Sequence, residues 1–315
     1  VRHMPSGLTT AVISRIKVMA EMDITEQRLP QDGRATVTIG ARPIDLRVST
    51  LPTAHGERAV VRLLDNQNRL SDIKQLGMPV DTRERFTQLI SSSHGMVLIT
   101  GPTGSGKTTT LYAALCQLGA RTAVADSPRN IMTLEDPIEY VHTNRKSVIE
   151  QREVYADTKG FSNALKYVLR QDPDVIMVGE MRDPETISAA LTAAETGHLV
   201  LATLHTNDCP QTIDRIIDSF PPYQQNQIRV QLASCLTAVL AQRLLPRAKE
   251  EGRIACFEIM TASTAVRALI RDNKTHLLKS TMENSAKDGM LTMDRARENL
   301  CNQGLITQET FRAYS

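Results

Sequence analysis

Hydrophobic positions along the chain recur first at helical spacing, then at alternating spacing, and these periods predict the first elements. Apolar residues three and four apart predict a helix over residues 8–22, with Ser6 as its N-cap. Three alternating or apolar runs follow and predict strands: Val37 with Ile39, residues 44–48, and residues 59–63. The N-terminal part of the chain therefore predicts a small α+β unit.

A polar stretch without periodicity, residues 65–69, is the best candidate for a linker. After it, short apolar runs alternate with helical stretches, which is typical of parallel strands covered by helices. The runs are 97–100, 131–134, 175–178 and 199–204. The segment 183–185 has the form of a helix start, and Gly197 stands where that helix should end. We therefore predict an α+β domain over 1–66 and a parallel α/β domain over 67–315.

Composition narrows the class of protein. The net charge is only +2, aromatic residues make up 3% and tryptophan is absent, so little favours a nucleic-acid partner. No apolar stretch approaches the roughly 18 residues of a membrane span, and no signal peptide is recognisable, so we expect a cytoplasmic protein. The five cysteines form no C-x-x-C pair, so no zinc site is predicted. The chain begins with Val1, so truncation at the N-terminus stays open.

The strongest chemical signal is a complete G-x-x-x-x-G-K-[ST] loop between a buried strand pattern and a helical pattern. Glycines let backbone N–H groups approach a triphosphate closely. The loop lysine is expected against the β- and γ-phosphates, and the following threonine hydroxyl on Mg²⁺. The sequence thus predicts ATP and Mg²⁺ as ligands. The predicted binding residues are Gly101, Pro102, Thr103, Gly104, Ser105, Gly106, Lys107, Thr108 and Thr109.

Two further strand patterns end in carboxylates. Residues 175–178 lead to Glu180 at the carboxyl end of a strand, where ligands bind in open α/β sheets, so Glu180 is predicted on the Mg²⁺ side with Thr108. Glu135 and Glu139, with an aspartate between them, follow another strand pattern. One carboxylate there can orient or deprotonate the attacking water, and another can hold Mg²⁺ through water. Beside the phosphate loop, these acids predict a hydrolytic site.

Histidines and arginines are the other candidates. His198 and His205 bracket the run 199–204, too far apart to share a metal ion, and spacing alone favours satisfied buried histidines. Arg47 and Arg62 lie in different predicted strands and can emerge side by side on one sheet face. A cation there can reach a neighbour's nucleotide and stabilise transition-state charge. A solvated basic face fits the composition equally well.

Taken in order, these motifs resemble those of the hexameric ATPases of type II secretion and type IV pilus systems, over nearly the whole chain. The matching segments are the phosphate loop 101–111, an acidic box at 135–139, a Walker B segment at 178–183 and a histidine box at 196–207. The resemblance implies a PAS-like N-terminal lobe, a RecA-like P-loop ATPase C-terminal lobe with a helical C-terminal region, and a homohexamer with ATP between lobes.

The resemblance also implies residue roles. Glu139 matches the family's catalytic glutamate and Glu180 its Walker B acid, and both histidines gain a functional interpretation that spacing alone did not favour. Arg47 and Arg62 match arginines of the N-terminal lobe that approach phosphate. The catalytic set predicted from residues and resemblance together is Glu139, Glu180, Glu135, Arg47, Arg62, His198 and His205.

We therefore expect a Mg²⁺-dependent ATPase motor that acts on an inner-membrane platform protein from its cytoplasmic face. Residues 28–34 and 46–53 resemble secretion and pilus-assembly members, whose tetracysteine zinc module is missing here, whereas 265–272 resembles pilus-retraction members. Pilus extension, pilus retraction and secretion stay open. Two other classes use the same core and also stay open: a RecA-like nucleic-acid translocase and a nucleotide-gated scaffold without useful turnover.

Overall fold

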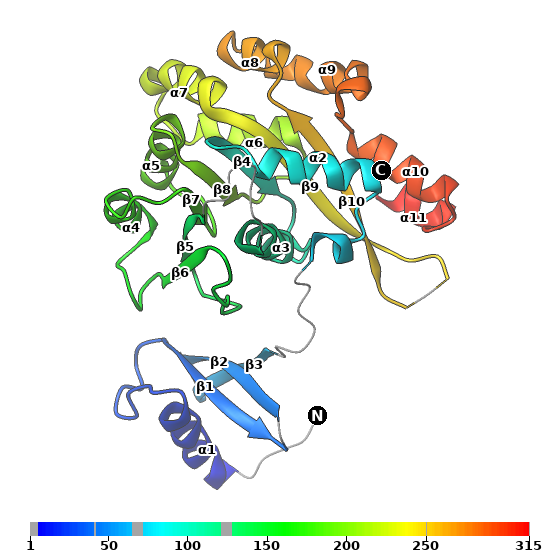
Figure 1. The fold of residues 1–315 in the computed structure, drawn as a ribbon. Coiled ribbons are helices and arrows are strands. Elements are labelled where there is room, and N and C mark those ends of the chain that lie inside the picture. The colour runs from blue at the N-terminus through cyan, green and yellow to red at the C-terminus, as the bar shows by residue number, and fades with distance from the viewer. Residues whose placement is uncertain (1–5, 41, 65–71, 121–127, 250, 315) are drawn as a thin grey trace. The chain divides into compact units, whose positions relative to one another are not determined.

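The computed structural model describes residues 6–40, 42–64, 72–120, 128–249 and 251–314 (Figure 1). The chain forms two compact units, Val1–Arg69 and Leu70–Ser315. The predicted linker at 65–69 lies outside the described residues, and so does the predicted boundary between 66 and 67. Each unit has its own sheet and its own buried core.

In the N-terminal unit, one helix packs against an antiparallel sheet of three strands in the order β1-β2-β3. The helix ends earlier than its apolar spacing predicted, because Glu21 has a positive φ of 57° that a right-handed helix cannot continue. The predicted α+β character is confirmed, while the PAS-like description stays a prediction. The elements are α1 (Ser6–Met19), β1 (Gln31–Ile39), β2 (Arg42–Thr53) and β3 (Gly56–Leu64).

A buried ion pair attaches α1 to this sheet. Lys17 lies within the helix, is 1% exposed, and has its Nζ 2.5 Å from Glu57 Oε1 on β3. The same amine donates to the backbone oxygen of Glu26 at 2.6 Å. A buried ammonium group is costly unless it is paired and hydrogen-bonded, so these two contacts tie the helix to β3 and to the segment between α1 and β1.

The larger unit is built on a seven-stranded sheet in the order β10-β9-β4-β8-β7-β5-β6. Strands β4 to β9 pair in parallel, and β10 closes the edge as an antiparallel hairpin with β9. The four predicted strands are confirmed, whereas β6, β9 and β10 were not predicted. The strands are β4 (Gly95–Thr100), β5 (Asn130–Glu135), β6 (Val148–Glu153), β7 (Val175–Val178), β8 (Leu199–Thr203), β9 (Leu236–Pro246) and β10 (Arg253–Thr261).

Helices cover both faces of this sheet, as continuous apolar strands require. Met96 and Leu98 on β4 pack with helices α4 to α10, and Val97 and Ile99 pack with α2 and α3 on the other face. The helices are α2 (Val80–Ile90), α3 (Lys107–Ala120), α4 (Phe161–Val168), α5 (Pro184–Glu195), α6 (Cys209–Asp218), α7 (Pro222–Cys235), α8 (Thr264–Arg271), α9 (Leu278–Asn284), α10 (Met293–Asn302) and α11 (Gln308–Ala313). Short 3₁₀ turns lie at Ile73–Leu76, Thr275–Leu277 and Ala286–Asp288.

The helix predicted after Asp183 is confirmed as α5, including its caps. The Asp183 side chain accepts a hydrogen bond from the Thr186 N–H at 2.8 Å, and Pro184 occupies the first turn. Gly197 follows the helix with a φ of 105°. In the part of the chain that the structure describes, no helix is long and apolar enough to cross a membrane.

Candidate nucleotide-binding site

The phosphate loop lies between β4 and the first residue of α3, in the predicted order of strand, loop and helix. Gly101, Gly104 and Gly106 have φ values of 146°, 78° and 88°, a region that side chains disfavour. A Cβ on Gly101 would lie 2.2 Å from the backbone oxygen of Gln242 on β9. Glycine is therefore required at residue 101 by both conformation and space.

Lys107 is held at this loop by the loop itself. Its Nζ donates to the backbone oxygens of Gly101 at 2.8 Å and Pro102 at 3.2 Å, and lies 3.4 Å from His205 Nδ1. The side chain is buried, which lowers the pKa of the amine, while the charge of Glu180 opposes that shift. The cation thus stands beside the helix N-terminus, where a phosphate would be bound.

The ends of β7 and β8 bring two further predicted residues to Lys107. Glu180 Oε1 lies 3.3 Å from His205 Nε2, and Glu180 Oε2 lies 2.6 Å from an Arg182 nitrogen. Burial acts to raise the pKa of Glu180, but the hydrogen bond from Arg182 and the neighbouring positive charges outweigh it and lower that pKa. Burial and the Lys107 charge lower the pKa of His205, so an ionised carboxylate faces a neutral imidazole at pH 7.

Thr108 and Glu180 provide the oxygen ligands that Mg²⁺ prefers, a hydroxyl and an ionised carboxylate. Thr108 lies in the first turn of α3, next to Lys107. Within the same loop, the Ser105 hydroxyl oxygen is buried and has no hydrogen-bond partner. A phosphate oxygen would satisfy that hydroxyl, so the residues present fit a Mg²⁺-nucleotide.

His198 does not join this cluster within the chain. It stands at the start of β8, at the other end of that strand from His205. Its Nδ1 lies 2.9 Å from the Ala193 oxygen and 3.2 Å from the Thr196 hydroxyl, at the end of α5. These contacts fit a histidine satisfied by the fold, and its catalytic role stays a prediction.

The two glutamates of the acidic box have different surroundings. Glu135 is 3% exposed, and its oxygens accept hydrogen bonds from Thr133 at 2.6 Å, from Gln151 at 2.9 Å and from the Tyr112 hydroxyl. Burial raises the pKa of Glu135. Glu139 is exposed, and its backbone N–H donates to the Tyr112 oxygen at 3.1 Å. The geometry therefore favours Glu139 over Glu135 as the carboxylate that meets water.

The arginines of the N-terminal unit do lie side by side, as predicted. Arg47 on β2 is directly opposite Arg62 on β3, and Arg34 on β1 is opposite Arg47. Like charges directly opposite one another disfavour a sheet, so a bound anion would relieve the repulsion between Arg47 and Arg62. The approach of these arginines to a nucleotide stays a prediction.

Sequence reasoning missed three side chains that hold the site. Gln242 on β9 accepts a hydrogen bond from Thr110 of α3 at 2.7 Å, beneath the phosphate loop. Tyr112 and Gln151 hold the acidic box. Each partner is distant along the chain, so no local motif could have revealed them. Among the described residues, no group of three or more acidic, histidine or cysteine side chains is arranged to hold a metal ion.

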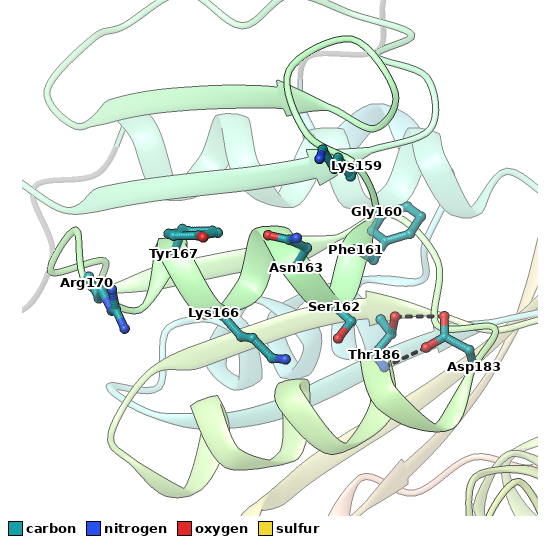
Figure 2. Close-up of a pocket in the computed structure, with 10 residues that line it drawn as sticks. All are labelled: Lys159, Gly160, Phe161, Ser162, Asn163, Lys166, Tyr167, Arg170, Asp183 and Thr186. Atoms are coloured by element: carbon teal, nitrogen blue, oxygen red, sulfur yellow. Dashed lines mark hydrogen bonds between the residues drawn. The ribbon is translucent and has the colours of Figure 1, made fainter.

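A separate hollow of about 660 Å³ lies beside α4 and the start of α5 (Figure 2). Its cations are Lys159, Lys166 and Arg170, and the Arg170 guanidinium lies 5.9 Å from the centre of the Tyr167 ring. Its carboxylate, Asp183, is already bonded to Thr186, as the dashed lines in Figure 2 show. The hollow is therefore basic, and no residue of the phosphate loop is among those that line it in the described part of the chain.

A family model described as Type II/IV secretion system protein matches residues 2–251. A twitching motility protein from Neisseria gonorrhoeae is 46% identical over 84% of this chain and 68% of its own length. The type II secretion system protein HxcR from Pseudomonas aeruginosa is 51% identical over 76% of this chain and 48% of its own length. The chain thus spans about two thirds of the first relative and about half of the second.

Two solved structures share the fold. A crystal structure of the pilus retraction motor PilT with bound ADP has a TM-score of 0.79 and 40% identity, over 91% of this chain and 78% of that one. The ATPase DotB from Legionella pneumophila has a TM-score of 0.81 and 24% identity, over 99% of this chain and 84% of that one, and supports the fold alone. The predicted RecA-like ATPase fold is confirmed by these matches.

Proposed function

Because the chain belongs to the family of type II/IV secretion system proteins, we propose that it is an ATP-hydrolysing motor of a pilus or secretion machine. The observation that carries this proposal is the convergence of Lys107, at the start of α3, with Glu180 and His205, which follow two strand ends, beside a complete phosphate loop. An ionised carboxylate next to a buried lysine and a neutral histidine suits phosphoryl transfer more than structural support.

Each residue has a distinct task in the proposed reaction. The loop N–H groups and Lys107 bind the β- and γ-phosphates, and Thr108 and Glu180 hold Mg²⁺, Glu180 partly through water. When bound, the metal neutralises charge on the phosphate oxygens. Glu139 orients the attacking water and accepts its proton, and His205 hydrogen-bonds near the γ-phosphate.

Variants of the purified protein test this assignment. Lys107→Ala or Glu180→Gln should abolish MgATP turnover. Glu139→Gln should bind ATP normally and hydrolyse it about 100-fold or more slowly, the usual contribution of a general base. Equal loss of binding and hydrolysis in Glu139→Gln would contradict its role, and normal turnover in Lys107→Ala would contradict the site.

We also propose a homohexamer in which Arg47 and Arg62 stabilise transition-state charge. The facing positions of Arg47 and Arg62 on the N-terminal unit support this role, because bound phosphate would offset their repulsion. Mixing Arg62→Ala with Lys107→Ala protein distinguishes two arrangements. Recovered ATPase activity means that the arginine acts on a neighbouring subunit's nucleotide, whereas no recovery means that it acts within its own subunit.

The machine it drives is proposed to be an inner-membrane platform approached from the cytoplasmic side. Deleting the gene in its host and counting surface pili separates the directions. Loss of pili means assembly, excess pili mean retraction, and unchanged pili with a retained secretion substrate mean type II secretion. Turnover stimulated by DNA would instead support a nucleic-acid translocase, and normal function of Glu139→Gln cells would support a scaffold.

A further inference from the structure

We propose that Tyr112 is a positioning residue for Glu139, which it connects to the helix that starts at the phosphate loop. This inference rests on the proposed function, in which Glu139 is the general base. Tyr112 lies on α3, the helix that begins with Lys107. The phosphate-binding end of that helix and the base are then joined through one side chain.

The Tyr112 hydroxyl uses both of its hydrogen-bonding capacities here. Its oxygen accepts the backbone N–H of Glu139 at 3.1 Å, and its hydrogen is donated to Glu135 Oε2. Burial, followed by the charge of Glu135, raises the pKa of Tyr112, so the phenol remains protonated and keeps donating. The buried Glu135 therefore orients the phenol, and the phenol in turn holds the backbone of Glu139.

The rest of the acidic segment is held in the same way, by side chains of β6. Gln151 donates to Glu135 Oε1 at 2.9 Å and to the Tyr140 backbone oxygen at 2.8 Å, and accepts the His142 N–H at 2.6 Å. Glu153 accepts the Ile138 N–H at 3.1 Å. Side-chain contacts thus replace a regular backbone ladder on both sides of Glu139.

Ring packing holds Tyr112 independently of its hydroxyl. Its ring centre is 5.9 Å from that of Tyr140 and 5.1 Å from that of His142, and the last two are 4.8 Å apart. Tilted and edge-to-face pairs at these distances are favourable. A phenylalanine at residue 112 should keep this packing and lose only the two hydrogen bonds.

The consequence for catalysis follows from geometry. A general base must stay within hydrogen-bond reach of its water, and a misplacement of about 1 Å can cost about 100-fold in rate. Without the phenol oxygen, the Glu139 N–H loses the partner that ties it to α3. We expect Tyr112→Phe to lower kcat about 10- to 100-fold, with the KM for ATP within about twofold of the unaltered protein.

Thr133→Val is the matched control. It also removes one hydrogen bond to the Glu135 carboxylate, but among the described hydrogen bonds the Thr133 side chain has none to residues 136–142. Both variants should lose a similar amount of thermal stability, and only Tyr112→Phe should lose kcat. A kcat for Tyr112→Phe within about twofold of normal, or an equal fall for Thr133→Val, would overturn the proposal.

The decisive measurement repeats Tyr112→Phe in the Glu139→Gln background, in single-turnover assays of the assembled protein. If Tyr112 acts through Glu139, its change has no further effect there, because the group it positions is gone. If instead the rate losses of the two single variants multiply in the double variant, the proposal is overturned. If Glu139→Gln hydrolyses ATP slowly and Tyr112→Phe hydrolyses it at the normal rate, only the positioning role is refuted. If Glu139→Gln hydrolyses ATP at the normal rate, the general base and this inference are refuted together.

Should Tyr112→Phe melt too early to assay, Gln151→Leu tests the same idea from the other side of the segment. It removes the contacts to Glu135, Tyr140 and His142 without altering α3. A lowered kcat with an unchanged KM supports side-chain positioning of the base. An unchanged kcat contradicts it.

Discussion

The phosphate loop and the acidic segment both follow parallel strands of one sheet, yet they are held in place by opposite means. The loop, residues 101–106, is shaped by glycine conformations and by its own backbone, and its lysine bonds to loop carbonyls. The acidic segment, residues 135–142, is held by side chains from α3 and β6. The loop takes its shape mainly from its own backbone, with Gln242 of β9 beneath it, whereas the acidic segment depends on side chains elsewhere in the fold.

This difference predicts different responses to substitution. A loop shaped mainly by its own backbone fails when that backbone is blocked, and the defect is in phosphate binding. A segment held by distant side chains fails when those partners change, and the defect is in placing the catalytic group.

The largest effect is expected for Gly101→Ala. The new Cβ would lie 2.2 Å from the Gln242 oxygen and 2.6 Å from Ser105 Oγ, in a backbone conformation with φ at 146°. We expect ATP binding to weaken by about 100-fold or more, since backbone atoms cannot move aside without displacing the loop. Isothermal titration with ATP measures this.

Gly304→Ala is its control. Gly304 also has a positive φ, 68°, but a Cβ there meets nothing within 4 Å, and the residue lies between α10 and α11. It should cost about 1 kcal/mol of stability and leave ATP affinity unchanged. Equal affinities for both variants would show that the clash beneath the loop is not what demands glycine.

The same contrast explains how much the sequence could predict. The loop was predicted residue by residue, because its geometry depends on residues adjacent in the chain. The strand end carrying Glu180 and the paired positions of Arg47 and Arg62 were also predicted, since apolar runs and alternation report strands locally. From the residues alone the roles of Glu135 and Glu139 could not be separated, because Tyr112 and Gln151 reach them only after folding, and only the family resemblance singled out Glu139.

The element boundaries and the strands at the sheet edges could not be predicted for a related reason. β6 alternates polar and apolar residues weakly at a sheet edge, and its Gln151 and Glu153 serve the acidic segment more than the core. The hairpin of β9 and β10 is recognisable only from its pairing. A local pattern carries little information about an element that is stabilised by its partner.

Two glutamines, the buried Gln242 and the half-buried Gln151, give the intermediate effect. Gln242→Leu removes the acceptor of the Thr110 hydroxyl under the phosphate loop. Gln151→Leu removes the hydrogen bonds of that side chain to the acidic segment. We expect Gln242→Leu mainly to raise the KM for ATP, by about 10-fold, and Gln151→Leu mainly to lower kcat, by about 10-fold. Steady-state kinetics at saturating and limiting ATP separate the two.

The pair of glutamines also tests the comparison itself. Each change removes hydrogen bonds from polar partners inside the fold, so each should cost about 1 to 3 kcal/mol of stability, visible as a lower Tm. Matched losses of stability with opposite kinetic defects support two independently held regions. If both variants raise KM and lower kcat to the same degree, the loop and the segment behave as one unit, and the comparison fails.

The smallest effect concerns pH and the acidic segment alone. Burial lowers the pKa of His142 to about 4 from its ordinary 6.5, and its Nε2 is buried without a hydrogen-bond partner. Between these values the unfolded chain binds a proton that the folded protein does not, so stability falls as pH drops from about 6.5 to about 4.

His142→Phe isolates this effect, because it keeps a ring against Tyr112 and Tyr140 and cannot be protonated. Between pH 7.5 and pH 5 the free energy of unfolding of the unaltered protein should fall by about 2 kcal/mol. His142→Phe should not show this loss. Thermal melts at pH 7.5 and pH 5 give a shift in Tm for each protein. This shift should be about 5 °C larger for the unaltered protein than for His142→Phe. The phosphate loop has no such histidine buried without a partner, since His205 is bonded to Glu180 and lies beside Lys107 in the described site. Parallel melting shifts in the two proteins would mean that His142 is solvated, and that the acidic segment is held more loosely than its contacts indicate.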